Sequence, residues 1–512
     1  MTFLRTKKFL VQRLNCRKLS SKFQAFLVSG VSGALALTVY LLTLAPSLTW
    51  AHWGADGGDF ITAAVTGRLP HPPGFPFYML LARMMLWLPG DPARALNALS
   101  AGMAALAVMA LAWIALRRGA GPVMAAALAL TVGFAPLFWS QSLITEVHAA
   151  AAACVALTLV AVEARSAFGA GLGWGLALAV HPTTIFLAPW LLGRGADAPR
   201  RAFLDAPRGA SAPRQTRQSW GTDVPCRAYV QAYVQFVVGL ALGLSLYALP
   251  LLRGAGPEPW GDARTLAGWL EFSTARLYWG YAFALPLVEW PGRIVAWAAL
   301  LARQFTPVGA LLVLYGLTRW ARRAPGEVLG WLAAWGALNV YAIGYATHDS
   351  LVYLVGLLPL MIYPLVEGAR GMMVFITEAQ SSRRFFAICH LPFLRASVVI
   401  VLLPLALLAL NWGALDLSRD TEAAMWARTT LAQAPPEAVV LVAGDRHTFA
   451  LWYAQDALAL RPDVLLISRN FWSQPAYREF LAQHAGVTVA EPEEFAGVRP
   501  LCEVEEEVLR CQ

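Results

Sequence analysis

The chain has 512 residues, of which 58% are hydrophobic and only 14% are charged, and its mean hydropathy is positive. This balance excludes an ordinary soluble enzyme and indicates a protein that crosses a membrane several times. The net charge of +9 is unevenly distributed, since residues 414–512 hold 8 Arg and no Lys against 15 Asp plus Glu. The positive excess therefore lies before residue 414, where it is expected of cytoplasmic loops. For this reason the net charge does not indicate nucleic-acid binding.

The first 46 residues predict how the chain enters the membrane. Residues 1–24 are basic and are expected in the cytoplasm, and the apolar run 25–46 is too long for a signal-peptide core, which predicts a retained first span. This span places the next segment, 47–96, outside as a first external loop. Residues 77–89 are apolar but short, which predicts an interfacial helix there.

The first external loop carries an unusual acidic motif. Residues 56–60 read Asp-Gly-Gly-Asp-Phe, so that Asp56 and Asp59 lie between aromatic residues at the membrane boundary, where carboxylates are costly. Residues 69–76, Leu-Pro-His-Pro-Pro-Gly-Phe-Pro, predict a rigid turn that carries His71 back toward the membrane. We interpret this loop as an active site, although a solvated turn between two helices fits the motif equally well.

Further apolar runs predict about eleven membrane segments, with the N-terminus inside and the C-terminus outside. Pro182 disfavours an unbroken helix over 170–193, so His181 is expected at the tip of two short half-helices. The chain would then return to the cytoplasmic side, where the linker 198–222 is expected. A second external loop, 252–293, holds four tryptophans expected in the headgroup belt: Trp260, Trp269, Trp279 and Trp290. The other spans are expected near 97–116, 121–139, 147–163, 233–251, 294–317, 328–345, 350–366 and 395–413.

The tail, residues 414–512, reads as a small soluble α/β domain outside the membrane. Residues 439–442 and 464–467 predict buried strands, and residues 448–458 predict a helix between them. Residues 444–447 follow the first strand and have the character of a ligand site, although a plain helix cap is at least as good a reading. The candidates there are Asp445, Arg446 and His447. Cys502 and Cys511 are spaced so that a disulfide is permitted but not required.

Under this topology, the polar residues near the spans gather at the external face, whereas a random scatter would divide between the two faces. Each histidine alone is better explained as a helix cap or a packed polar group, but their convergence favours a site. An external carboxylate suits a general base for a hydroxyl acceptor, and His181 suits a phosphate leaving group. The residues expected there are Asp56, Asp59, His71, Glu146, His148, His181, His348 and Asp349.

Several of these stretches resemble a family of bacterial membrane proteins that includes an animal transmembrane O-mannosyltransferase. The resemblance rests on residues 44–49, 56–60 and 70–78, with further matches at 97–101, 138–147 and 175–182, and looser ones at Asp349, 444–445 and 461–464. The family has Glu where this chain has Asp59. The resemblance implies the GT-C architecture, with an acidic residue of the first external loop as base and no metal. We favour Asp59 slightly over Asp56.

The sequence hypothesis is therefore an all-α polytopic membrane protein of GT-C type with a small extracytoplasmic α/β domain. Residues 25–413 would form the transmembrane domain in the plasma membrane. The protein would move a sugar, in this family usually mannose, from a polyprenyl-phosphate donor to a hydroxyl of a protein or glycan, without a cofactor and without binding nucleic acid. The rivals are a non-enzymatic flippase or carrier of lipid-linked sugars, and a scaffold protein whose acidic tail binds a partner.

Overall fold

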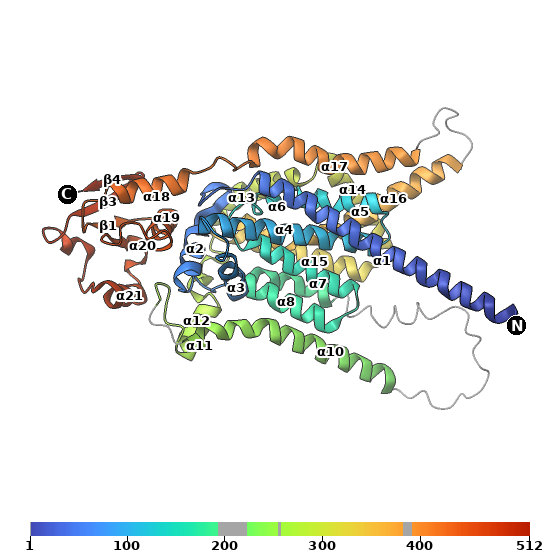
Figure 1. Cartoon of the computed structure of the whole chain (residues 1–512), viewed down its shortest axis with the longest axis horizontal. Helices are drawn as coiled ribbons and strands as arrows, with labels where there is room; N and C mark the ends of the chain where they lie inside the picture. Colours follow the sequence, from blue (N-terminus) through green and yellow to red (C-terminus); the bar gives the residue numbers. More distant parts are fainter. Residues whose placement is uncertain (1, 193–222, 254–257, 382–391, 512) are drawn as a thin grey trace.

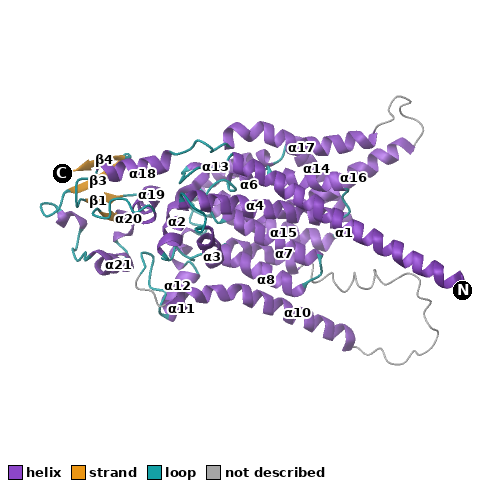
Figure 2. Ribbon diagram, viewed as in Figure 1, coloured by secondary structure: helices purple, strands orange, loops and turns teal. Residues whose placement is uncertain are grey.

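The structure is a computed structural model, and it describes residues 2–192, 223–253, 258–381 and 392–511. A long bundle of helices makes up most of the molecule, and a small unit that contains a four-stranded sheet lies at one end of the bundle (Figures 1 and 2). The N-terminus lies at the opposite end (Figure 1). The predicted linker 198–222 falls outside the described residues.

Five helical segments among the described residues are long enough and apolar enough to cross a bilayer by themselves. Ser350–Phe375 is the central one, because 94% of its most apolar window is buried inside the protein, against 17% for Val230–Leu252. The helices that provide these spans are α1 (Thr2–Leu42), α4 (Pro92–Arg117), α10 continued by η3 and α11 (Asp223–Leu244, Ser245–Ala248 and Leu249–Arg253), η6 with α16 (Ser350–Met361 and Ile362–Ser381) and α17 (Pro392–Leu415).

Shorter helices pack between these spans. The break predicted at His181 is confirmed, since α8 ends at Val180 and the short helix η2 begins at Pro182, with His181 in an extended conformation between them. Proline has no N–H to continue the helical ladder, so the chain turns there. The shorter helices are α5 (Pro122–Gly133), α6 (Pro136–Ser140), α7 (His148–Glu163), α8 (Ala167–Val180) and η2 (Pro182–Leu187), and the 20-residue α15 (Pro325–Gly344) packs with them.

The span predicted over 294–317 is not one unbroken helix. Two helices, α13 (Trp290–Gln304) and α14 (Pro307–Arg323), replace it and are bent by 96°. Pro307 occupies the first turn of α14, and the Thr306 hydroxyl caps that helix by accepting a hydrogen bond from the Gly309 N–H. A proline and a capping residue both begin a new helix, and neither lets the preceding one run on.

The acidic motif lies on a helix and not on a loop. A short helix, η1 (Ala51–Asp56), ends at Asp56, and α2 (Gly57–Thr66) begins at the next residue. The proline-rich turn then leads into α3 (Pro76–Met85), at the position of the predicted interfacial helix. As a result, Asp59 lies in the first turn of α2, and its side chain is buried by its neighbours.

The segment between α10 and α13 folds over the bundle end that faces the sheet. Trp260 does not lie in a headgroup belt, because it is only 8% exposed and packs against Phe471 of the C-terminal unit, with 4.6 Å between ring centroids. Trp279 remains 63% exposed. The short helices here are η3 (Ser245–Ala248), α11 (Leu249–Arg253), α12 (Leu266–Ser273), η4 (Arg276–Tyr281) and η5 (Leu287–Glu289).

The C-terminal unit is built on a sheet with strand order β2-β1-β3-β4. Both predicted strands are present, and the central strand β1 runs parallel to β2 and to β3, while β3 and β4 are antiparallel. Cys502 and Cys511 lie opposite each other on β3 and β4 and form a disulfide. The strands are β1 (Val439–Val442), β2 (Leu465–Ser468), β3 (Leu501–Glu505) and β4 (Val508–Cys511), and the helices are α18 (Glu422–Gln433), α19 (Asp445–Trp452), α20 (Arg469–Trp472) and α21 (Pro475–Ala485).

The C-terminal unit packs closely on α2. A Cβ atom placed on Gly58 would lie 2.2 Å from the Phe449 carbonyl oxygen, so only glycine lets α19 approach this near. Behind the contact, Ser47 and the Tyr453 hydroxyl share hydrogen bonds with Asp91 at the start of α4. The C-terminal unit is therefore fixed to the membrane domain by backbone contact and by a buried polar cluster.

Candidate active site

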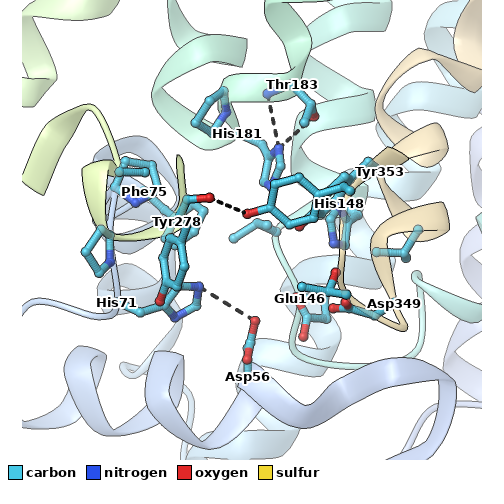
Figure 3. A pocket seen from close by; sticks show the side chains of 18 of the residues that line it. Asp56, His71, Phe75, Glu146, His148, His181, Thr183, Tyr278, Asp349 and Tyr353 are labelled. Atoms are coloured by element: carbon cyan, nitrogen blue, oxygen red, sulfur yellow. Dashed lines mark hydrogen bonds and ion pairs between the residues drawn. The ribbon is translucent and has the colours of Figure 1, made fainter. Parts of the chain in front are cut away.

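A cavity of about 830 Å³ lies where the helix bundle meets the C-terminal unit (Figure 3). Its walls come from segments that are far apart in sequence, and nearly all of them enter at a helix end or a turn. The polar residues that line it include Asp56, His71, Glu146, His148, His181, Thr183, Tyr278, Tyr345, His348, Asp349, Tyr353 and Asp445.

The structure brings together eight of the eleven residues that the sequence singled out. Asp59, Arg446 and His447 do not line the cavity. The eight that do are Asp56, His71, Glu146, His148, His181, His348, Asp349 and Asp445. Groups separated by nearly 400 residues therefore meet in one place, although their chemical roles remain proposals.

The two carboxylates of the acidic motif have different surroundings. The Asp56 carboxylate faces the cavity, and its Oδ2 lies 3.6 Å from the Nε2 atom of His71. Asp59 lies behind His71, where its Oδ2 contacts the ring Nδ1 and accepts a hydrogen bond from the His71 N–H, both at 2.8 Å. Only 3% of Asp59 is exposed, so it cannot reach a molecule bound in the cavity. The sequence slightly favoured Asp59 as the base, but the geometry does not support that choice.

Acidic groups gather around Asp56. The Asp56 pKa is raised from 3.8 to about 6, first because the group is removed from bulk water and also because Asp349, Asp59 and Asp445 lie nearby, while His71 opposes the rise. The side chain is 37% exposed, and its free surface opens into the cavity. This pKa lets Asp56 be ionised at neutral pH and yet remain basic enough to take a proton.

Glu146 and Asp445 flank this acidic end. Burial and the charges of Asp56 and Asp349 raise the Glu146 pKa well above its ordinary value. Burial also raises the Asp445 pKa, although a hydrogen bond from Asn470 opposes the effect. The Asn470 side chain also accepts a hydrogen bond from the Gly444 N–H, and it thereby holds the turn after β1 in place. A carboxyl group such as Glu146, when it holds its proton, can donate a hydrogen bond to a hydroxyl of a sugar.

The opposite side of the cavity holds imidazole and aromatic rings. His181 and Thr183 lie across from Asp56 in Figure 3. The Thr183 N–H donates to the His181 Nδ1 at 3.3 Å, so that atom carries no proton and Nε2 must carry it. The His181 ring lies 5.2 Å from those of His148 and Tyr353, centroid to centroid. A neutral imidazole with Nε2–H free of Thr183 is a hydrogen-bond donor for an anionic oxygen.

The other two candidates of the C-terminal unit have a structural role. The Arg446 guanidinium lies 4.3 Å from the centroid of the Trp50 ring and pairs with Glu507. The His447 ring packs between Trp50 and Trp426, with centroid distances of 5.4 and 4.9 Å. Both residues therefore help to fasten α19 to η1, and of the three candidates in this turn only Asp445 reaches the cavity.

Sequence reasoning missed the tyrosines of the cavity. Tyr353 follows Asp349 by four residues, which is one helical turn, so that spacing could have identified it. Tyr278 carries no motif and reaches the cavity only through the fold of the segment before α13. In the part of the chain that the structure describes, no group of three or more His, Cys, Asp or Glu side chains is arranged to hold a metal ion.

Two family models match the chain. The model of the protein O-mannosyl-transferase TMEM260 N-terminal domain matches residues 56–192, and that of TMEM260-associated domain 2 matches residues 423–486. Protein O-mannosyl-transferase TMEM260 of Mus musculus is 25% identical over 489 residues, which are 88% of this chain and 64% of that protein. The chain therefore spans just under two thirds of the length of this relative.

Two crystal structures of ArnT from Cupriavidus metallidurans are similar in fold at 13% identity. The apo structure has a TM-score of 0.57 over 93% of this chain and 92% of that one, and the structure bound to undecaprenyl phosphate has 0.51 over 89% and 94%. At this identity the likeness shows the fold alone. The chain is thus a multi-pass membrane protein with an ArnT-like fold of GT-C type, and two of its segments match models of TMEM260 domains.

Proposed function

We propose that the protein is a glycosyltransferase that moves a sugar from a polyprenyl-phosphate donor to a hydroxyl acceptor at the outer face of the plasma membrane. The observation that carries the proposal is the Asp56 carboxylate, which faces a cavity whose opposite side holds the neutral His181 ring. The similarity to an O-mannosyl-transferase supports mannose as the sugar and a protein hydroxyl as the acceptor.

The transfer is a single displacement. The ionised Asp56 accepts the proton of the acceptor hydroxyl while the hydroxyl oxygen forms a bond to C1 of the sugar. The bond between C1 and the phosphate oxygen breaks, and the electron pair leaves with the polyprenyl phosphate. Attack from the side opposite the phosphate inverts the configuration at C1. This geometry requires the base and the phosphate site to lie on opposite sides of the cavity, as Asp56 and His181 do.

Hydrogen bonds, and not a fixed cation, would receive the phosphate. None of the described residues that line the cavity is Arg or Lys. The groups available opposite Asp56 are the His181 Nε2–H, His148 and the Tyr353 hydroxyl. Such donors stabilise an oxyanion most strongly in a site that excludes water. Such a cavity suits a donor whose phosphate gains negative charge only when its bond to the sugar breaks.

The cavity also lies where a lipid-linked donor is expected. Trp279, which lines it, is 63% exposed, and the nearby Leu287 and Val288 are each 85% exposed. Apolar side chains exposed at the end of a membrane bundle are suited to the boundary between lipid and water. The polyprenyl chain would remain in lipid beside this segment while the phosphate and sugar enter the cavity.

The test is Asp56→Asn, assayed in membranes supplied with labelled polyprenyl-phosphate mannose and their endogenous acceptors. Loss of a general base should reduce transfer by about a hundredfold or more. Asp262→Asn is the matched control, because Asp262 is partly exposed, pairs with Arg264 and does not line the cavity, and it should leave transfer unchanged. Full transfer by the Asp56→Asn protein would refute the proposal, and transfer from a glucose donor alone would refute the choice of sugar.

A further inference from the structure

Asp59 fixes the orientation of the His71 ring. One carboxylate oxygen, Oδ2, accepts the His71 backbone N–H and lies 2.8 Å from the ring Nδ1. In this contact Nδ1 is the donor when the carboxylate is the acceptor. The other ring nitrogen, Nε2, then points toward Asp56, 3.6 Å away.

Aromatic rings hold His71 in this position. Phe60 and Phe75 lie 5.1 and 4.9 Å from it, centroid to centroid, and Trp260 and Tyr278 close the remaining sides at 5.9 and 6.3 Å. The ring therefore has little freedom to turn over. Because the hydrogen bonds of Asp59 go to the buried side of His71, its contacts influence the cavity through the position of this ring, while its charge also acts directly on Asp56.

The His71 imidazole is surrounded by acidic side chains. Asp56, Asp59 and Asp445 face His71, and the acids whose charges act on Asp56 are Asp349, Asp59 and Asp445. Burial alone would lower the His71 pKa, but the carboxylates outweigh it and raise the pKa above 6.5. Among the described residues, His71 is thus the group that opposes the mutual repulsion of these acids.

We propose that Asp59 is a positioning residue that holds His71 with Nε2 toward Asp56, so that the imidazolium keeps Asp56 ionised for proton transfer. The inference rests on the proposed function, since it assigns the base role to Asp56. It separates two carboxylates that the motif presents as equivalent: Asp56 meets the acceptor, and Asp59 holds His71 from behind the cavity wall.

Substitutions can separate these roles. Asp59→Asn can keep both hydrogen bonds to His71, because a single oxygen accepts them, but it removes the negative charge. His71→Asn keeps an N–H donor for Asp59 and removes the cation. In the His71→Asn protein, the pH at which Asp56 ionises should rise by about one unit, because an opposite charge nearby has been lost.

The experiment is a double-mutant cycle of Asp59→Asn and His71→Asn, with the transfer rate measured against pH. We expect Asp59→Asn to reduce transfer about tenfold in the parent protein at pH 5, where a one-unit rise in the Asp56 pKa acts almost in full, and about twofold at pH 7; it should cost nothing further when His71 is already Asn. In the His71→Asn protein, Asp59→Asn removes only a charge that repels Asp56, so the acid limb of the pH profile should move back to lower pH.

A base role for Asp59 predicts a different result. Asp59→Asn would then abolish transfer in both backgrounds, which would overturn the inference, as would an unchanged rate in the parent protein. Thermal unfolding in detergent shows whether each variant is folded, and Asp262→Asn serves as the control. An Asp56→Asn protein that transfers normally would instead overturn the proposed function, so the two failures are distinguishable.

Discussion

The close contact between Gly58 and α19 makes a sharp prediction about how the two parts of the protein build one cavity. In the Gly58→Ala protein, the new Cβ would lie 2.2 Å from the Phe449 oxygen and 2.5 Å from its carbonyl carbon. Ordinary contacts between such atoms are about 3.5 Å, so α19 would have to move away by about 1 Å. Alanine favours a helix by about 1 kcal/mol over glycine, but overpacking of this kind costs about 1–3 kcal/mol.

The displacement should reduce activity more than stability. Asp445 and Phe449 both lie on α19 and both line the cavity, so the shift would move one wall away from Asp56. A misplacement of about 1 Å can reduce a rate about a hundredfold. The assay is sugar transfer in membranes, together with thermal unfolding of the purified protein. Gly102→Ala is the control, because Gly102 is exposed within α4 and a Cβ there meets nothing within 4 Å. Wild-type transfer by Gly58→Ala would refute the reasoning.

Two further predictions concern pH and the disulfide. Because the reaction needs the ionised Asp56, whose pKa is about 6, transfer should fall about tenfold per pH unit below that value and level off above it, which a rate profile between pH 4.5 and 8 measures. The raised pKa also means that the folded state binds this proton more tightly than the unfolded chain, so this group's contribution to stability should decrease as pH rises from 3.8 to about 6. Replacing Cys502 and Cys511 by serine opens the link between β3 and β4, so unfolding of the C-terminal unit should become easier by about 2–3 kcal/mol in a denaturant titration, while transfer should persist, since neither residue lines the cavity.

The gathering of polar groups was predictable because a membrane limits where such groups can lie. Charges within spans are costly, so His148, His181 and Asp349, which flank apolar runs, had few positions open to them. The break at His181 followed from Pro182 alone. Neither conclusion needed a tertiary contact. Hydropathy and a single proline are therefore enough to assign groups from distant parts of the chain to one face.

The unequal roles of Asp56 and Asp59 were not predictable in this way. Which carboxylate faces the cavity depends on α2 beginning at Gly57 and on the proline-rich turn that brings His71 over Asp59. Trp260 was misplaced for a similar reason, because its partner Phe471 lies more than 200 residues away. The bend before Pro307 was missed although its signals are local, since the apolar run 294–317 continued across it.

The positions of the site residues share one physical cause. Asp56 ends η1, His148 begins α7, His181 separates α8 from η2, Asp349 precedes η6 and Asp445 begins α19. Helix ends leave backbone N–H and C=O groups without helical partners, and in a membrane protein these groups are tolerated only beside other protein or in a polar cavity. A site built from broken helices therefore already requires a wet, polar space, which the reacting hydroxyl and phosphate can share. The same breaks make the site depend on packing between segments, so that a single methyl group at Gly58 is expected to disturb it.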